Sequence, residues 1–373
     1  MCLCLPNMAP EQQREGGASR RGPILGVVRL FAWLGVIGVG GPAAHIAMMR
    51  RRVVQRDGWV SDDDFARMVG ACALVPGPNS TEMAMALGAR RAGWRGLVAG
   101  GASFIVPAFV VVCVVAWLYE DVLTSAVIAD VRRWAVPVVA AIVLDALWSL
   151  RGTAVRDWRD VVVVVAALIG AVAGLPELLV LALVGAAATV LRSRTKHRTA
   201  AFGSFAVLFA VSPSLTKIFL VFLQIGSVIY GSGYVLLVFL ESEVVDRGWI
   251  TPEVLLDAVS VGQFTPGPVF TTATFIGWHL SGFAGAVVAT VGIFGPSFVF
   301  AALVDRVVGW SQRSSTFAAF LRGVSTGSIA LMAVVMWRLA DEAIVDALAA
   351  TTFVAVFVVL RARSVRRWWS ARR

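Results

Sequence analysis

The stretch Cys72-Ala73-Leu74-Val75-Pro76-Gly77-Pro78-Asn79-Ser80-Thr81-Glu82 interrupts a long apolar segment, and its central tripeptide returns in a second one as Pro266-Gly267-Pro268. Proline lacks a backbone N–H and its ring clashes with the carbonyl one turn earlier, so neither tripeptide fits inside a continuous helix. In lipid, such breaks persist only where the protein buries the freed backbone groups or where they line a wet cavity. Matching breaks in two halves of a chain are typical of the transport site of a membrane carrier.

Composition places the chain in a membrane. Of its 373 residues, 58% are hydrophobic and 15% are charged, and the mean hydropathy is +0.80. Soluble domains carry about 25% charged residues, and apolar runs near the ~18 residues that span a bilayer recur along this sequence. We therefore predict an all-α, polytopic helical protein in a lipid bilayer.

The net charge of +10 comes from arginines that cluster at segment ends. This distribution is typical of cytoplasmic loops, and no soluble domain offers the basic face that nucleic-acid binding requires. The four cysteines and three histidines are scattered, so no metal or other cofactor is expected. The sequence has no phosphate-binding Gly-Lys-Ser/Thr loop, so we do not expect an ATP-driven pump. Glu82, Asp145 and the scattered histidines form no nucleophile–base pair, so we do not expect an enzyme.

The chain divides into five parts. We predict a disordered tail at 1–22, a first membrane repeat at 23–191, a basic linker and apolar lead-in at 192–213, a second repeat at 214–361 and a basic tail at 362–373. The predicted membrane segments are Val27–Met49, Phe65–Leu87, Leu97–Tyr119, Val131–Leu150, Val161–Gly174, Glu177–Leu191, Ile218–Leu240, Val254–His279, Gly282–Val304, Phe317–Leu339 and Ala343–Leu360. In Val27–Met49, the dense glycines indicate either close helix packing or a further broken helix.

The two repeats match residue by residue. Gly35 and Gly40 correspond to Gly226 and Gly231, Arg56 and Trp59 to Arg247 and Trp249, and Pro107 to Pro296, with a spacing that shortens twice by one residue. Two unrelated apolar stretches would not align arginine, tryptophan and proline in this way. The chain is therefore an internal duplication.

Loop charge predicts the topology. The connections 50–56, 90–95, 151–159, 192–198 and the tail from Arg361 are basic, whereas 119–130, 175–177, 241–253 and 341–342 are neutral or acidic. All the basic connections fall on the cytoplasmic side, and all the neutral or acidic ones outside, if each Pro-Gly-Pro segment enters the membrane and returns on the same side as a re-entrant hairpin. The arms of such a hairpin, about 11–13 residues each, are too short to span the bilayer. We then expect nine crossings, an outside N-terminus, a cytoplasmic C-terminus and two inverted repeats.

These motifs resemble those of the chromate ion transporter family in its two-domain form. The resemblance covers residues 29–360 and rests on Gly40-Gly41-Pro42-Ala43-Ala44-His45, both Pro-Gly-Pro tripeptides, Tyr230-Gly231-Ser232-Gly233-Tyr234, Arg247-Gly248-Trp249-Ile250-Thr251, Gly262-Gln263-Phe264-Thr265 and Gly295-Pro296-Ser297. It implies chromate export from the cytoplasm across the plasma membrane and chromate resistance, with sulfate as the chemically similar oxyanion. Self-association is left open.

The candidate substrate site lies at the two tips. The N-terminus of a half-helix offers unpaired N–H groups and a positive dipole end to an anion, so we assign Pro76, Gly77, Pro78, Asn79, Ser80, Thr81, Gln263, Pro266, Gly267, Pro268, Thr271 and Thr272 to an anion cradle. The alternative is that these hydroxyl groups only cap their helices.

Four more residues are candidates for gating or coupling. Arg56 and Arg247 could attract the anion or anchor the membrane interface. His45 could sense protons, although its counterpart is Leu236, which favours a structural role. Glu82 is a carboxyl inside an apolar segment, where it could carry a coupling proton or pair with an arginine.

Two transport functions remain open at this point. The first is a secondary chromate exporter driven by the membrane potential or a proton gradient, and the second is a carrier of sulfate or another oxyanion through the same site.

Overall fold

The computed structural model describes residues 23–39, 41–73, 75–122, 125–192, 214–229, 235–343 and 346–370, in which helices are joined by turns and no β-strand occurs. The predicted tail at 1–22, all of the predicted linker at 192–213 except Arg192, and the Tyr230–Tyr234 motif lie outside these ranges. The predicted all-α fold is confirmed for the described residues.

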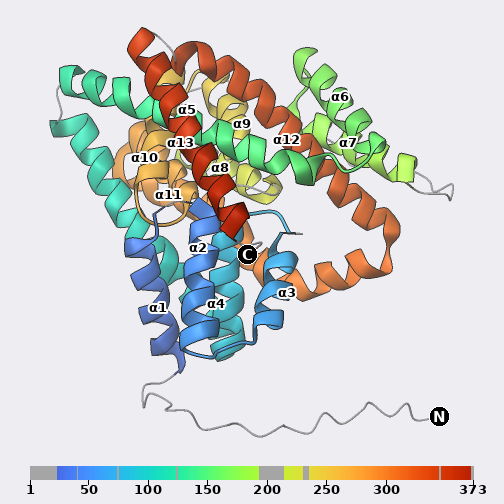
Figure 1. Ribbon diagram of the computed structural model, residues 1–373. Coiled ribbons are helices and arrows are strands. Elements are labelled where there is room, and N and C mark those ends of the chain that lie inside the picture. Colours follow the sequence, from blue (N-terminus) through green and yellow to red (C-terminus); the bar gives the residue numbers. More distant parts are fainter. Residues whose placement is uncertain are drawn as a thin grey trace, which may run out of the picture.

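Each repeat follows the same order of helices (Figure 1). The first contains α1 (Pro23–Ile37), α2 (Gly41–Arg50), η1 (Arg51–Arg56), α3 (Asp62–Cys72), α4 (Asn79–Trp117), η2 (Leu118–Val122), α5 (Ser125–Ala154), α6 (Trp158–Val172) and α7 (Glu177–Arg192). The second contains α8 (Leu215–Val228), α9 (Leu236–Leu240), η3 (Glu241–Val245), α10 (Pro252–Phe264), η4 (Val269–Thr271), α11 (Thr272–Arg313), α12 (Ser315–Ala343) and α13 (Ala347–Ser370). Among the described helices of the second repeat, none corresponds to α7.

The duplication extends to the backbone angles. Glycines with positive φ recur at matching positions, Gly58 with Gly248, Gly77 with Gly267 and Gly93 with Gly282. Because L side chains rarely adopt such angles, the same three turns are built into both repeats. The predicted pair of homologous repeats is confirmed.

The segments Val27–Met49 and Ile218–Leu240, predicted as membrane segments, are each broken in the middle. Helix α1 ends at Ile37 and α2 begins at Gly41, while α8 ends at Val228 and α9 begins at Leu236. For the first segment, the structure decides between the two glycine interpretations in favour of a broken helix. For the second segment no break was predicted, and the structure shows that the helix ends at Val228, where Ile229 is extended.

Helices α4 and α11 each contain a return bend. In α4 the bend lies at Ala92 and Gly93, and in α11 at Ser281 and Gly282, where the φ and ψ angles leave the helical region. The chain then packs back on itself so closely that a Cβ on Gly88 would lie under 3.0 Å from the carbonyl oxygen of Gly96. Each long helix is therefore a short arm (79–91 in α4) followed by a reversed long arm (94–117).

Small residues let the helices approach one another, as is common in membrane proteins. A Cβ on Gly35 of α1 would lie 2.8 Å from the Phe104 carbonyl oxygen of α4, and Gly226 of α8 faces Ile293 of α11 in the same manner. Helices α4 and α11 also pack against each other, while α12 packs against α5, α6 and α7. The two repeats are thus joined along their central helices.

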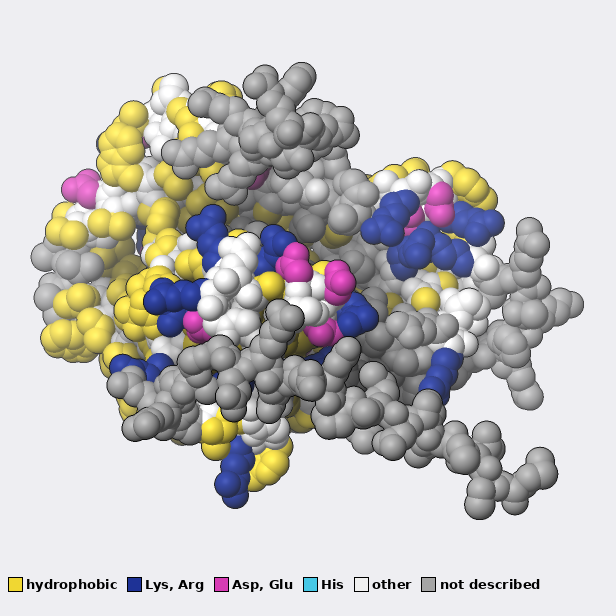
Figure 2. Space-filling model, turned by 60° about the horizontal axis from the view of Figure 1, so that its bottom comes forward, with side chains coloured by type: hydrophobic (Ala, Val, Ile, Leu, Met, Phe, Trp, Pro, Cys, Tyr) yellow, Lys and Arg dark blue, Asp and Glu magenta, His cyan; other side chains and the backbone are white. Residues whose placement is uncertain are grey.

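Three of the described helices are long and apolar enough to cross a membrane, at Asn79–Glu120, Val269–Val304 and Ser315–Trp337. Shorter apolar helices occur at Pro23–Ile37, Leu215–Val228 and Ala347–Ala362. Figure 2 views the end that α1 to α4 occupy at the bottom of Figure 1, where Lys and Arg side chains gather with acidic partners. Exposed arginines there come from the connection after α2 and from the return bend of α4: Arg50, Arg51, Arg56, Arg90, Arg91 and Arg95.

A capping box begins α6 away from this end. The Asp157 carboxylate accepts hydrogen bonds from the backbone N–H groups of Arg159 (2.9 Å) and Asp160 (3.1 Å). The bond from Asp160, with the charge of Arg192 at 3.6 Å, lowers the pKa of Asp157. This cap fixes where α6 starts after the basic connection.

Candidate functional site

Each Pro-Gly-Pro tripeptide forms the tip of a helical hairpin. Helix α3 leads to the first tip, and the short arm of α4 leads back from it. The guanidinium carbon of Arg91, at the end of the short arm, lies 5.4 Å from the ring centroid of Trp59, just before α3. Both ends of the hairpin therefore meet at one end of the molecule, which is the geometry predicted for a re-entrant element.

The two tips are bound reciprocally by the opposite repeats. The Gly77 N–H donates to the Ile229 carbonyl oxygen at 2.8 Å, and the Gly267 N–H donates to the Gly38 carbonyl oxygen at 2.7 Å. Gly38 follows α1 and Ile229 follows α8, at equivalent positions of the two broken segments. We call this pair of hydrogen bonds the cross-repeat latch.

The Pro-Gly-Pro sequence explains why the latch uses glycine. Proline has no N–H, so the glycine supplies the only backbone donor of each tripeptide. Gly77 has a φ of 136° and Gly267 a φ of 101°, in the region that favours glycine. The same residue thus provides both the turn and the hydrogen bond.

The first tip is surrounded by buried oxygen atoms. A Cβ on Gly77 would lie 2.8 Å from the hydroxyl oxygen of Ser297, on α11, and under 3.0 Å from a carboxylate oxygen of Glu82. Both side chains have an exposed fraction of 0%. Within the described part of the chain, neither the Glu82 carboxylate nor the hydroxyl groups of Ser297 and Thr81 have a hydrogen-bond partner.

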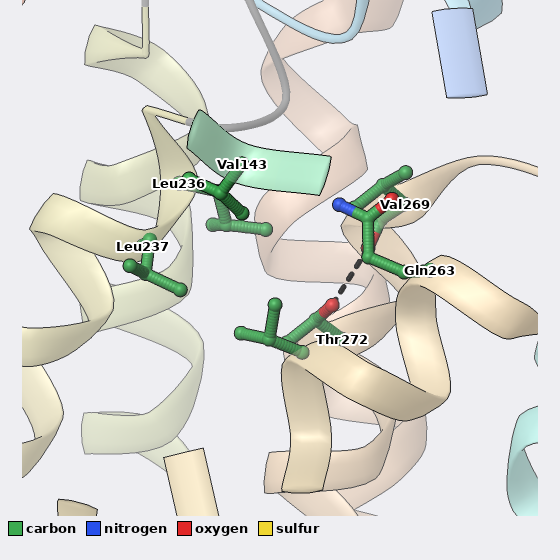
Figure 3. A pocket seen from close by; sticks show the side chains of 7 residues that line it. Val143, Leu236, Leu237, Gln263, Val269 and Thr272 are labelled. Atoms are coloured by element: carbon green, nitrogen blue, oxygen red, sulfur yellow. Dashed lines mark hydrogen bonds between the residues drawn. The ribbon is translucent and has the colours of Figure 1, made fainter. Parts of the chain in front are cut away.

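The second tip has its polar groups satisfied. The hydroxyl of Thr271 donates to the Pro268 carbonyl oxygen at 2.9 Å, and that of Thr272 donates to the Val269 carbonyl oxygen at 2.8 Å. Beside them lies a cavity of about 10 Å³, lined by Val143, Leu236, Leu237, Val259, Gln263, Val269 and Thr272 (Figure 3). This cavity holds about one water molecule and is too small for an oxyanion in this conformation.

The two tips therefore differ chemically although their backbones match. Glu82 corresponds to Thr272, and Ser297 corresponds to Ala108, whose Cβ lies 2.5 Å from the position of a Cβ on Gly267. The carboxyl and its neighbouring hydroxyl occur only at the first tip. The duplicated scaffold carries one acidic and one neutral site.

Helix capping by side chains does not explain the predicted site residues. Pro78 and Pro268 precede the new helices and provide no side-chain cap. The N–H groups of Thr81 and Glu82 donate to the Pro78 carbonyl oxygen at 2.8 and 3.0 Å. Asn79 and Ser80 occupy the first turn, where N–H groups have no carbonyl of their own helix to bind.

His45 lies close to the latch. Its Nε2 donates to the Gly38 carbonyl oxygen at 2.9 Å, the same oxygen that accepts from Gly267, and its ring packs edge-on against Phe104 at 5.2 Å. Since a carbonyl oxygen can only accept, Nε2 carries hydrogen. His45 therefore contacts the seat of the second tip although it belongs to the first repeat.

Arg56 and Arg247 are not brought to the tips. Arg56 lies before α3, whose 11 residues place it about 16 Å or more from the first tip. Arg247 forms an ion pair with Glu243 one turn earlier, and Glu243 also accepts from the amide of Gln224 at 3.1 Å. Both arginines lie at the outer ends of their hairpins.

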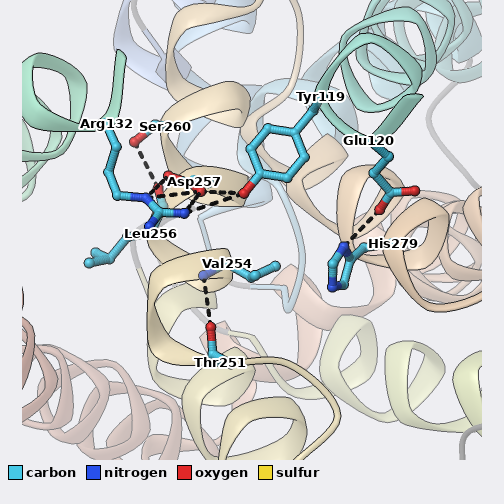
Figure 4. A network of polar contacts seen from close by, with 9 residues as sticks. All are labelled: Tyr119, Glu120, Arg132, Thr251, Val254, Leu256, Asp257, Ser260 and His279. Carbon is cyan, nitrogen blue, oxygen red and sulfur yellow. Dashed lines mark hydrogen bonds and ion pairs between the residues drawn. The ribbon is translucent and has the colours of Figure 1, made fainter. Parts of the chain in front are cut away.

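A polar network missed by sequence reasoning joins the second hairpin to the first repeat (Figure 4). Asp257 of α10 accepts from the Tyr119 hydroxyl at 2.6 Å and forms an ion pair with Arg132 of α5. Nearby, Nδ1 of His279 and Oε1 of Glu120 are 2.7 Å apart. Asp257 carried the same signal as Glu82, an ionisable residue inside an apolar segment, and could have been found by it.

No group of His, Cys, Asp and Glu in the described ranges could hold a metal ion. The site is thus built from helix N-termini, hydroxyl groups and one carboxyl.

Comparison with known proteins identifies the family. The family model "Chromate transporter" matches residues 25–190 and 216–370. A probable chromate transport protein of Synechococcus elongatus is 30% identical over 332 residues, which cover 84% of each chain. Chromate transport proteins of Pseudomonas aeruginosa and Cupriavidus metallidurans are each 28% identical, over 81% and 86% of this chain and 77% and 83% of their own. No solved structure matches. The two matched segments coincide with the two repeats, and the chain belongs to the chromate transporter family.

Proposed function

We propose that the protein is a secondary transporter that exports chromate from the cytoplasm across the plasma membrane and thereby confers chromate resistance. The observation that supports this function best is the cross-repeat latch, which places two half-helix N-termini at the interface between repeated halves. Secondary transporters commonly bind their substrates at such an interface. The names of the relatives support chromate as the substrate.

The anion is held without a buried cation in this proposal. N–H groups and dipoles at helix N-termini stabilise negative charge, and the described tips contain hydroxyl groups but no Lys or Arg. Asn79, Ser80 and Thr81 serve the first tip, and Gln263, Thr271 and Thr272 serve the second. The six residues of the two Pro-Gly-Pro tripeptides shape the site.

Export fits the energetics of a negative cell interior. Moving one negative charge outward gains about 2.3 kcal/mol per 100 mV, so a dianion gains about 4.6 kcal/mol. The alternative substrate is sulfate, which is also a tetrahedral dianion and would use the same site. In either case transport, and not catalysis, is the proposed activity.

We place the N-terminus outside and the C-terminus in the cytoplasm, with nine crossings and re-entrant hairpins. Single cysteines at Arg56 and Arg90 should then react with an impermeant thiol reagent from the cytoplasmic side, and one at Glu253 from the outside. Labelling of Arg56 and Arg90 from opposite sides would rule out the re-entrant topology.

Transport is tested by measuring chromate and sulfate uptake into inside-out vesicles. Wild-type protein should move chromate, and Pro266→Ala should reduce the flux because the tip regains helical freedom. Gly295→Ala is the matched control, since a Cβ there meets no atom within 4 Å. Movement of neither anion by the intact protein would refute the transport function, and faster sulfate flux would favour the alternative.

A further inference from the structure

Glu82 lies in an environment where an ionised carboxylate would be unstable without a partner. It is fully buried, it lies at the first tip beside Gly77, and both of its oxygen atoms lack a hydrogen-bond partner within the described residues. Its counterpart Thr272 has the same burial but donates its hydroxyl to a carbonyl oxygen. The unsatisfied group is therefore specific to the first repeat.

No neighbouring charge compensates Glu82 in the described part of the structure. On the helices packed against α4, Cys72 of α3 is a buried free cysteine, His45 of α2 binds the Gly38 carbonyl and Asp257 of α10 pairs with Arg132. Arg29 of α1 is exposed, and His279 of α11 lies 2.7 Å from a carboxylate oxygen of Glu120. The other ionisable groups of α3 are Asp62 to Asp64 and Arg67, toward its opposite end. Ser297 is the polar side chain that shares the Gly77 contact, and a hydroxyl does not neutralise a charge.

A buried carboxyl without a cation is stable chiefly as the neutral acid. As an acid it can donate a hydrogen bond, and Ser297 can donate another from the facing repeat. Two donors beside a helix N-terminus suit an oxyanion, whereas an ionised Glu82 would repel it. Binding of the anion and of a proton on Glu82 should therefore favour each other.

We propose that Glu82 carries one proton together with each anion, and that Ser297 is a further substrate-binding residue across the repeat boundary. This inference rests on the proposed transport function and names its coupling ion. The carboxyl takes up a proton from the side where the anion loads and releases it on the side where the anion leaves. On the release side the tip separates from Ile229, water solvates Glu82 as a carboxylate, and the empty carrier returns in that opened state. One dianion and one proton then move per cycle, and one net negative charge crosses.

The latch links this site to motion. Gly77, which the Glu82 and Ser297 oxygens contact, is also the residue whose N–H binds Ile229. Separation of the tip from Ile229 would change the surroundings of the carboxyl at the same time. Proton release and tip movement are thereby coupled at one residue.

The number of charges moved per chromate tests the proposal. Purified protein is reconstituted in proteoliposomes at an alkaline pH where chromate is a dianion, and the potential that stops net flux is measured. With equal pH on both sides, a tenfold chromate gradient is balanced by about 59 mV if one net charge moves and by about 30 mV if two move. Wild type should give the first value and Glu82→Gln the second.

A pH gradient provides the second readout. A tenfold proton gradient should shift the wild-type balancing potential by about 59 mV and leave that of Glu82→Gln unchanged. The matched control is Glu253→Gln, at an exposed carboxyl at the start of α10, which should behave as wild type. Ser297→Ala should keep the one-charge stoichiometry and require several-fold more chromate for half-maximal flux.

The outcomes are distinguishable. A balancing potential of about 30 mV per tenfold gradient in wild type, or the same value in wild type and Glu82→Gln, overturns the assignment while leaving chromate transport intact. Absence of chromate flux in wild type refutes the proposed function and this inference with it. If Glu82→Gln does not fold, Glu82→Asp replaces it and should retain one charge per chromate; two charges there would contradict the proposal.

Discussion

The contact between Gly267 and Ala108 allows a quantitative test of how the second tip is seated. Gly267 has a φ of 101°, and a Cβ added to it would lie 2.5 Å from the Cβ of Ala108. In Gly267→Ala the unfavourable φ costs about 1–2 kcal/mol, and the steric overlap costs about 1–3 kcal/mol. We expect the free energy of unfolding to fall by about 2–5 kcal/mol in all.

A second substitution separates the two costs. Ala108→Gly removes the atom that the new methyl group meets, and alone it costs about 1 kcal/mol because glycine is unfavourable inside a helix. After its removal, the nearest atoms to the new methyl are the Gly35 carbonyl oxygen at 3.4 Å and the Cα of residue 108 at 3.6 Å. The overlap cost should vanish in the double variant while the φ cost remains.

The assay is unfolding of the four purified proteins in detergent, followed by intrinsic fluorescence. The double variant should be more stable than the sum of the single effects predicts, by about 1–3 kcal/mol. Additivity within about 0.5 kcal/mol would mean that Gly267 does not pack against Ala108. In that case the second tip is not seated in the first repeat as described.

Three further substitutions test other parts of the fold. Gly277→Val should sharply reduce the yield of monodisperse protein in gel filtration, because its side chain would collide with the Gly285 carbonyl oxygen across the return bend. Gly295→Ala should behave as wild type. Equal yields of the two variants would contradict the bend. Asp257→Asn should lower the free energy of unfolding by up to about 3–5 kcal/mol, because it leaves the partly buried Arg132 without its counter-ion. Tyr119→Phe removes one hydrogen bond to the carboxylate and should lower it by about 1.5–3 kcal/mol. The reverse order in denaturant unfolding would contradict the network. Asp157→Ala should lower the melting temperature at neutral pH. Since the pKa of Asp157 is lowered in the folded protein, the difference from wild type should shrink as pH falls through that pKa. No difference at neutral pH would show that the cap contributes nothing, and a difference independent of pH would show that its negative charge contributes nothing.

The hairpins were predictable because proline acts locally. The absence of two N–H groups breaks a helix whatever surrounds it, and the repeated tripeptide placed both breaks. The return of the helix at Asn79 and its end near Arg91 also follow from local signals. By contrast, the break between α1 and α2 stayed ambiguous, since glycine serves both close packing and chain reversal.

The partners of the tips could not be predicted. The bond from Gly77 to Ile229 joins two backbone groups far apart in sequence, and no side-chain pattern records it. The sequence also could not show that Arg56 and Arg247 lie away from the tips. Their matching positions in the two repeats show that they are equivalent residues, but not how far from the tips they lie. In the sequence Ser297 is marked only by its place in the Gly295-Pro296-Ser297 motif, and its proximity to Glu82 depends on the packing of α11 against the first tip.

The cross-repeat latch bears on how a duplicated gene can diverge. Its donors and acceptors are main-chain atoms, so mutation of the accepting residue changes the side chain and keeps the bond, as glycine at 38 and isoleucine at 229 illustrate. Each copy was thereby free to accept a different side chain beside its tip, a carboxyl in one and a hydroxyl in the other. A symmetric ancestor could become an asymmetric carrier by single substitutions, without ever losing the contact that holds its halves together.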